Sequence, residues 1–214
     1  MKKITTILTA LFLLFSFSAL KAEMGIGVTG AIHAIEADGT ETARDSAEKN
    51  TGSHSEDVAV PEIFVEAILD SGWAIGMSYV PVRDMGSKSR SDTNSAGDTG
   101  TYTASAELDD VMQAYVDVPL FSVMNFPLHA KLGIQHVNLK TLESLNSGST
   151  YPDANLLGYT IGLGVKGDIG SNMYYKVEAT YTDFETYESE SSASNKVTAD
   201  IDSTAGRLSL GYKF

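Results

Sequence analysis

The sequence contains no cysteine, so disulfide bonds do not stabilise it, and a small disulfide-rich secreted fold is excluded. Proline is scarce, with 5 in 214 residues, and after residue 22 no apolar run is long enough to form a transmembrane helix. Basic residues are few: 15 lysines and arginines stand against 28 aspartates and glutamates, a net charge of −13. So acidic a chain is a poor ligand for nucleic acid, and no nucleic-acid partner is expected.

The N-terminus differs in texture from the rest of the chain. Lys2 and Lys3 precede an apolar run from Ile7 to Phe17, and a short polar stretch ends at Ala22. This layout is typical of a secretory signal peptide, and an uncleaved anchor helix is the alternative. We predict a signal peptide over residues 1–22 and one mature domain over residues 23–214. An exported chain without an apolar helix can span a membrane only as a closed β-barrel.

The mature sequence alternates apolar and polar residues with a period of two, and it lacks helical periodicity. The end of the chain illustrates the pattern, because Leu208 and Leu210 alternate with Arg207 and Ser209. Such alternation predicts strands with one apolar and one polar face. Eight strands are predicted, over residues 24–35, 58–69, 73–82, 112–118, 128–135, 157–166, 173–182 and 206–214.

The connections between these segments alternate in length. Those after the second, fourth and sixth strands are short and read DSG, PLFSVMNF and DIGSN. The others are long and polar, over residues 36–57, 83–106, 140–154 and 185–199. This pattern is typical of outer-membrane proteins. We therefore predict an all-β fold: an eight-stranded antiparallel transmembrane β-barrel with short periplasmic turns and long extracellular loops. Ten strands, with hairpins in the long loops, are the alternative.

The apolar face of the predicted strands is expected to contact lipid. Its aromatic residues fall at two levels, as in the girdles of membrane barrels. Near the periplasmic ends they are Trp73, Tyr175, Tyr212 and Phe214, and near the outer ends Tyr79, Tyr159 and Tyr181. The expected surroundings of this face are outer-membrane lipids and lipopolysaccharide.

The polar face would then line the lumen, which in an eight-stranded barrel is just wide enough for side chains. The charged residues on this face are Glu62, Glu66, Asp117, Lys131, Lys166, Lys176, Glu178 and Arg207. Opposite charges crowded into so narrow a space are expected to pair and to fill it. A continuous unpaired polar path would instead make a small porin-like channel for ions or small solutes, which is the alternative function.

The C-terminal sequence LSLGYKF resembles the terminal strand signal of bacterial outer-membrane proteins, through Leu208, Leu210, Tyr212 and Phe214. The mature chain as a whole resembles small eight-stranded barrels of the OmpA and OmpX type, which are porin-like proteins of the Gram-negative cell envelope. The resemblance implies location in the outer membrane, export through the inner membrane, and insertion by the barrel-assembly machinery.

Some barrels of this size are lipid A deacylases, which place a histidine and a serine two residues apart on a strand. The four histidines here stand in HAI, HSE, HAK and HVN, so the motif is absent. We expect no enzyme, no cofactor and no metal site, and a lipid-modifying enzyme using His33 or His136 is a remote alternative. The acidic loop residues, which could attract divalent cations, are Asp183, Glu185, Glu188, Glu190, Asp200 and Asp202. A structural surface protein that presents these loops is the favoured function.

Overall fold

A computed structural model describes residues 22–42, 44, 47, 49–93, 99–144, 152–190 and 194–214, so most of the expected signal peptide lies outside the described residues. Within these ranges no helix is long and apolar enough to cross a membrane. The chain forms ten strands: β1 (Ala22–Thr42), β2 (Lys49–Leu69), β3 (Ala74–Val80), β4 (Arg83–Thr93), β5 (Thr99–Val123), β6 (Phe126–Ser144), β7 (Ala154–Ile169), β8 (Met173–Phe184), β9 (Tyr187–Glu190) and β10 (Lys196–Lys213).

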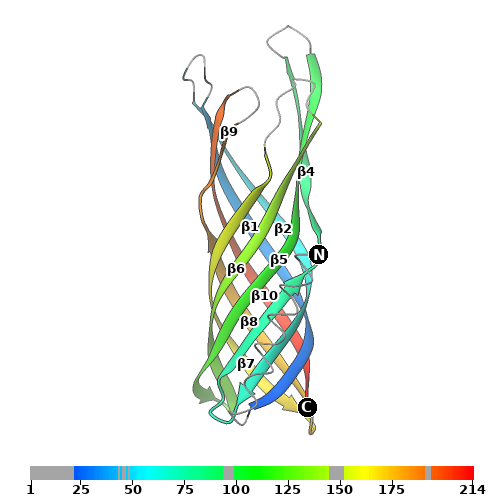
Figure 1. Ribbon diagram of the computed structural model, residues 1–214, viewed down its shortest axis with the longest axis vertical. Coiled ribbons are helices and arrows are strands. Elements are labelled where there is room, and N and C mark those ends of the chain that lie inside the picture. The colour runs from blue at the N-terminus through cyan, green and yellow to red at the C-terminus, as the bar shows by residue number, and fades with distance from the viewer. Residues whose placement is uncertain are drawn as a thin grey trace, which may run out of the picture.

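Eight of the strands form one closed antiparallel ring, which confirms the predicted barrel (Figure 1). Going round the wall the order is β1, β2, β3, β5, β6, β7, β8 and β10, and β10 pairs with β1 to close it. β4 and β9 are additional strands that pair with β5 and β10. A closed ring suits a membrane because it leaves no unpaired strand edge in lipid.

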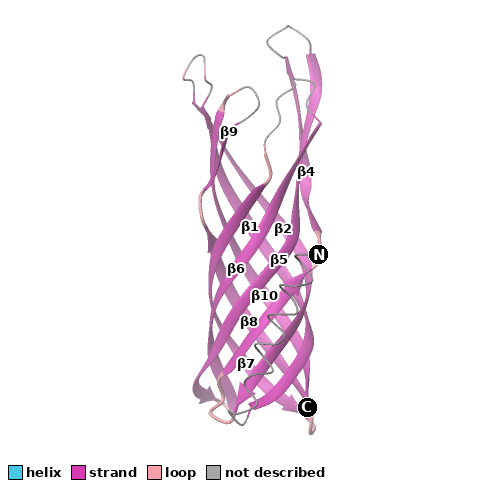
Figure 2. Cartoon of the chain, in the orientation of Figure 1, coloured by secondary structure: helices cyan, strands magenta, loops and turns pink. Residues whose placement is uncertain are grey.

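Each wall strand has an outer apolar face and an inner polar face, as a side-chain period of two requires. On β8, Lys176 and Glu178 are buried inside, whereas Val177 and Tyr181 are exposed outside. A soluble barrel has the opposite arrangement, with apolar side chains inside and polar side chains outside. Here the apolar outer surface is the one that contacts lipid. Figure 2 shows that almost the whole of the described chain is in strands.

The prediction of long polar loops was wrong over much of their length. β1 and β2 stay paired as far as Thr42 and Lys49, and β5 and β6 as far as Thr103 and Ser144. The glycine-, serine- and threonine-rich segments suggested loops because they lack apolar alternation. Beyond the lipid, however, both faces of a strand contact water, so a strand there needs no apolar face. Backbone pairing can continue because the barrel below has already fixed the register of the two strands.

These extensions divide the outer rim into two sheets, which rise at the top of Figure 1. One contains β9, β10, β1 and β2, and the other contains β4, β5 and β6. The β2–β3 ladder ends at the pair Ile63–Tyr79, and Pro61 and Pro81 lie two residues further along. Pro61 therefore falls inside β2, on the side of the strand that β3 no longer covers. A proline suits this point because it has no N–H to offer a ladder.

Candidate functional site

The lumen gathers the charged residues of the polar faces. Seven of the eight predicted lumen charges are buried inside the barrel: Glu62, Glu66, Asp117, Lys131, Lys176, Glu178 and Arg207. The eighth, Lys166, is half-buried, and its Nζ donates to the carbonyl oxygen of Gly72 at 2.6 Å. It therefore lies beside the periplasmic turn between β2 and β3, apart from the other seven.

The seven buried residues form one chain of alternating charge, here called the charge chain. On its first half, Lys176 Nζ lies 2.7 Å from Glu66 Oε2 and 3.2 Å from Asp117 Oδ2. Asp117 Oδ1 in turn forms an ion pair with Lys131 Nζ at 2.7 Å. Each cation thus lies between two carboxylates, which is the arrangement that best offsets the cost of removing both signs from water.

The second half continues from Lys131 to Glu178 Oε1 at 3.1 Å. Arg207 then bridges two carboxylates, with Nε 3.6 Å from Glu178 Oε2 and Nη2 2.8 Å from Glu62 Oε2. Because Glu62 and Glu66 both lie on β2, the charge chain leaves that strand, crosses the lumen and returns to it. It therefore braces opposite walls of the barrel.

Two tyrosines complete one end of the charge chain, and sequence reasoning assigned them no role. Tyr115 and Tyr174 donate their hydroxyls to Glu66 at 2.6 and 2.8 Å. The Lys131 ammonium also lies 3.6 Å from the centre of the Tyr115 ring, within range of a cation–π interaction. Strand alternation could have found Tyr115, because it shares the inner face of β5 with Asp117.

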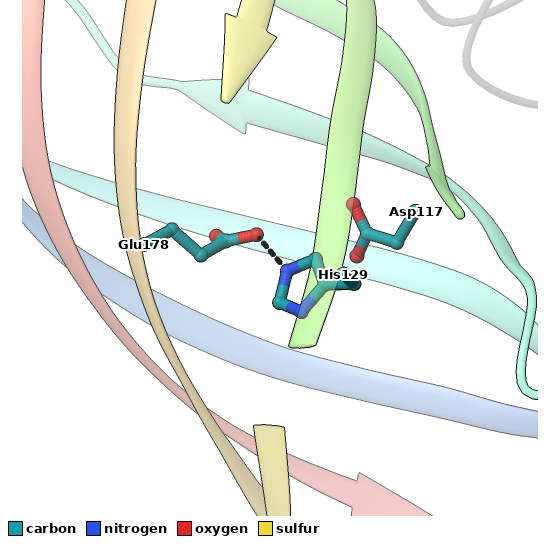
Figure 3. A group of neighbouring side chains, drawn as sticks. All are labelled: Asp117, His129 and Glu178. Carbon is teal, nitrogen blue, oxygen red and sulfur yellow. Dashed lines mark hydrogen bonds and ion pairs between the residues drawn. The ribbon is translucent and has the colours of Figure 1, made fainter. Parts of the chain in front are cut away.

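A histidine lies where two carboxylates converge (Figure 3). His129 Nε2 is 2.9 Å from Glu178 Oε1, and one potential ligand atom from each of Asp117, His129 and Glu178 falls within 4.8 Å of the others. This is the spacing of a possible metal site. The residues fit a metal poorly, however, because the Lys131 ammonium forms ion pairs with both carboxylates and its charge repels a cation. Lys131 is the cation that this group holds.

Two glycines make room for the long side chains of the charge chain. A Cβ on Gly76 would lie 2.5 Å from Cζ of Tyr115. A Cβ on Gly164 would lie 2.7 Å from Cγ of Glu178 and 2.8 Å from Cε1 of His129. All three contacts are far inside van der Waals distance, so the absence of a side chain at these two positions is part of the site.

Neutral polar groups lie next along the barrel toward the outer end. Gln113 Nε2 donates to Thr160 Oγ1 at 2.9 Å, and Thr160 shares a bond of 2.8 Å with Thr182. These bonds link β5 to β7 and β8, so polar cross-links continue above the charge chain. Thr29 and Ser209, which share a hydrogen bond of 2.8 Å between β1 and β10, lie in register with Glu62 and Lys176 of the charge chain.

The level of Thr160 and Thr182 also contains a histidine–serine pair that the sequence motif did not predict. His33 Nδ1 lies 3.0 Å from Ser203 Oγ, and the side chain of Ser203 is buried facing the lumen. Within the described residues, no group bonds the other ring nitrogen of His33, so no third residue orients it as in a hydrolase triad. His136, the other rim candidate, is exposed on the outer face.

An apolar layer lies toward the outer end of the lumen. Val60, Val80, Val111 and Val137 are buried together, and Val58, Leu108 and Phe184 pack against them. The four valines come from the neighbouring strands β2, β3, β5 and β6, and Phe184 comes from β8. The described lumen therefore passes from charged to neutral polar to apolar side chains.

The outer wall carries the predicted girdle residues. Trp73, Tyr159, Tyr181, Tyr212 and Phe214 are exposed, whereas Tyr79 and Tyr175 are half-buried. The Tyr79 hydroxyl donates to Asp110 Oδ1 at 3.1 Å. On the terminal strand, Leu208, Leu210, Tyr212 and Phe214 are all exposed outward.

The acidic residues of the outer rim do not converge on one point. Asp183 lies opposite Asp202 across β8 and β10, Asp200 accepts from Thr186 at 2.7 Å, and Glu188 lies 3.9 Å from Lys196. Within the described part of the chain, Asp117, His129 and Glu178 are the only such group close enough to share a metal ion.

Comparison with known proteins agrees with this architecture. A family model described as "Outer membrane protein beta-barrel domain" matches residues 7–214. No curated protein sequence matches the chain significantly.

Several solved structures are similar in fold. The outer membrane protein AlkL, solved in DMPC lipid bilayers, is 10% identical with a TM-score of 0.53, over 91% of this chain and 90% of AlkL. OprG from Pseudomonas aeruginosa is 14% identical with a TM-score of 0.50, over 91% of this chain and 97% of OprG. The protease OmpT from Escherichia coli is 9% identical with a TM-score of 0.49, over 90% of this chain and 97% of OmpT. The family match, the closed ring and the apolar outer wall together identify the chain as a member of the outer membrane protein β-barrel family, a small barrel of the bacterial outer membrane.

Proposed function

We propose that this protein is a sealed outer-membrane scaffold that presents two acidic β-sheets at the cell surface. The observation that supports the sealed lumen is the charge chain, in which seven buried charges alternate in sign at separations of 2.7–3.6 Å. An ion that entered the lumen would have to displace these pairs. Because the unpaired charges would remain buried, displacement would be strongly unfavourable.

The apolar layer at the outer end supports the same proposal. Its clustered valines are poorly wetted, and hydrophobic constrictions block ion flow by excluding water. An ion approaching from outside would meet this layer before it reached the neutral polar groups and the charge chain.

The surface role rests on the two sheets above the membrane. Their rim carries acidic residues such as Glu36 and Asp202, which lie opposite each other on β1 and β10. We propose that these sheets are the contact surface for the extracellular environment, with divalent cations and lipopolysaccharide as neighbours. The protein would reach this position by signal-peptide export and by recognition of its terminal strand by the barrel-assembly machinery.

A narrow channel is the second candidate function. The hydrogen-bonded hydroxyl groups above the charge chain offer a polar lining, which favours it. A catalytic role is not proposed, because the His33–Ser203 pair lies inside the barrel, away from lipid, and has no orienting partner in the described residues.

Ion efflux from liposomes tests the sealed lumen. Native protein refolded into potassium-loaded liposomes should release potassium no faster than protein-free liposomes. Arg207→Gln, which leaves Glu62 and Glu178 without their shared cation, should release it faster or should fold less stably. Rapid efflux through the native protein would favour the channel instead.

Surface presentation has its own test because the chain is free of cysteine. A cysteine replacing Ser55 in the outer part of β2 should react with a membrane-impermeant maleimide on intact cells. Ser171→Cys, in the short turn after β7, is the matched control and should react only after the outer membrane is opened. The reverse result would contradict the proposed orientation.

A further inference from the structure

The short turn between β5 and β6 is apolar although it lies at the periplasmic end. Residues 118–128 carry no charge, and Phe121 and Met124 are 67% and 87% exposed. Leu120, Val123 and Phe126 are exposed as well. The other two short turns contain Asp70 and Ser71, and Ser171 and Asn172, as expected for turns in water.

The backbone of this turn is also unusual. The predicted turn over residues 119–126 shrinks to Met124 and Asn125, because β5 continues to Val123 and β6 begins at Phe126. Both turn residues are left-handed, with φ of 48° and 69°. The other two turns place Gly72 and Gly170 at their left-handed positions. Methionine is disfavoured in this conformation, so another interaction has to compensate for keeping an apolar side chain at the tip.

A bulge adds a further apolar side chain. β5 pairs with β6 at Pro119–His129 and again at Ser122–Pro127, so Leu120 and Phe121 together oppose Leu128. Bulges commonly re-aim side chains at the rims of barrels. Here the extra residue enlarges the exposed apolar surface at the membrane end of the hairpin.

The apolar surface of the turn is continuous with the lipid-facing wall. The next residues of the hairpin are Val118 opposite Ala130 and Val116 opposite Leu132, on the outer face of the barrel. Ile169 and Met173, which pair at the end of the β7–β8 hairpin, are exposed too. This uncharged patch continues the lipid-facing wall of the barrel. It is therefore better suited to contact lipid acyl chains than to bind a charged periplasmic partner.

We propose that the β5–β6 turn is inserted into the periplasmic leaflet of the outer membrane and binds phospholipid acyl chains as an anchor. Insertion buries the apolar side chain of Met124 in lipid, and this burial offsets the cost of its left-handed backbone conformation. It also explains why this turn alone, among the three short turns, has a large apolar residue at a left-handed position. The inference does not depend on whether the lumen conducts.

Tryptophan fluorescence tests the anchor, because Trp73 is the only native tryptophan. In a Trp73→Phe background, Met124→Trp reports on the β5–β6 turn, and Ser171→Trp in the polar β7–β8 turn is the matched control. Both variants are refolded into phosphatidylcholine–phosphatidylethanolamine vesicles, with folding verified by heat-modifiable electrophoretic mobility. Quenching is measured with acyl chains brominated near the headgroup and with acrylamide present on both sides of the bilayer.

The anchor predicts that Met124→Trp emits at shorter wavelength than Ser171→Trp, loses most of its emission in brominated lipid, and shows a several-fold smaller acrylamide quenching constant. Equal acrylamide quenching of the two variants, with no effect of bromine on Met124→Trp, would overturn the proposal. Protection from acrylamide without bromine quenching would also overturn it, because the turn would then be covered by protein, such as a second copy of the chain.

Discussion

Replacing Lys131 with methionine is the sharpest test of the charge chain. The substitution keeps the length of the side chain but removes the ammonium that lies 2.7 Å from Asp117 and 3.1 Å from Glu178. The Lys131 side chain is 1% exposed, so water cannot replace the lost partner. Removing one partner of a buried ion pair costs about 3–5 kcal/mol, and Lys131 pairs with two carboxylates. We expect the free energy of unfolding to fall by about that amount.

The assay is urea unfolding of the refolded protein in lipid vesicles, followed through the fluorescence of Trp73. Lys140→Met is the matched control, because Lys140 also approaches a carboxylate, that of Asp109, at 2.7 Å, but its side chain is 38% exposed. Its midpoint should barely move, since water solvates the partner that remains. Asp117→Asn in the Lys131→Met background should recover part of the loss, with a coupling energy of about 1–3 kcal/mol.

Three outcomes would refute this reasoning. Lys131→Met could unfold within experimental error of the native protein, it could resemble Lys140→Met, or the Asp117→Asn change could simply add to it. Any of them would mean that the charges are hydrated in the lumen rather than paired, and the sealed scaffold would lose its physical basis.

Further predictions concern hydrogen bonding, packing and the apolar turn, all measured by the same unfolding assay. Tyr115→Phe removes the hydroxyl 2.6 Å from Glu66 and should cost about 1–3 kcal/mol; no change would imply that water replaces it. Gly164→Ala should cost about 1–3 kcal/mol by overpacking against Glu178 and His129, whereas Gly206→Ala, with open space around its Cβ, should be neutral. Equal effects would contradict the packing of the lumen. Met124→Gly relieves a left-handed residue, worth about 1–2 kcal/mol, but loses apolar burial worth about 1.5–3 kcal/mol. It should therefore destabilise the protein slightly in vesicles, and a gain would argue that the turn lies in water.

The barrel could be predicted from sequence because its wall is one layer thick. Every residue of a wall strand faces either lipid or lumen, so the alternation around Val177 and Glu178 assigns both without knowledge of any partner. The same alternation placed Lys131 and Arg207 on the inner face. Closure by eight strands followed from the count of alternating segments, and the structure confirms it.

Contacts across the lumen could not be predicted in the same way. The stagger between neighbouring strands decides which residues share a level, and nothing local in the sequence encodes it. Glu66 therefore meets Lys176, 110 positions further along the chain, and Tyr174 as well. The polar extensions of β1 and β2 escaped prediction because strands with water on both faces need no apolar alternation. The turn over residues 119–126 was predicted, but its tightening to Met124 and Asn125 was not, because methionine is not a typical turn residue.

Single-channel recording in a planar lipid bilayer tests the central claim, the sealed lumen, most directly. Refolded native protein, shown to be inserted by protease protection, should give no current steps at moderate voltage, because the charge chain and the apolar layer together leave no path for ions. Steady and reproducible steps from the native protein would contradict the account and would identify it as a small channel.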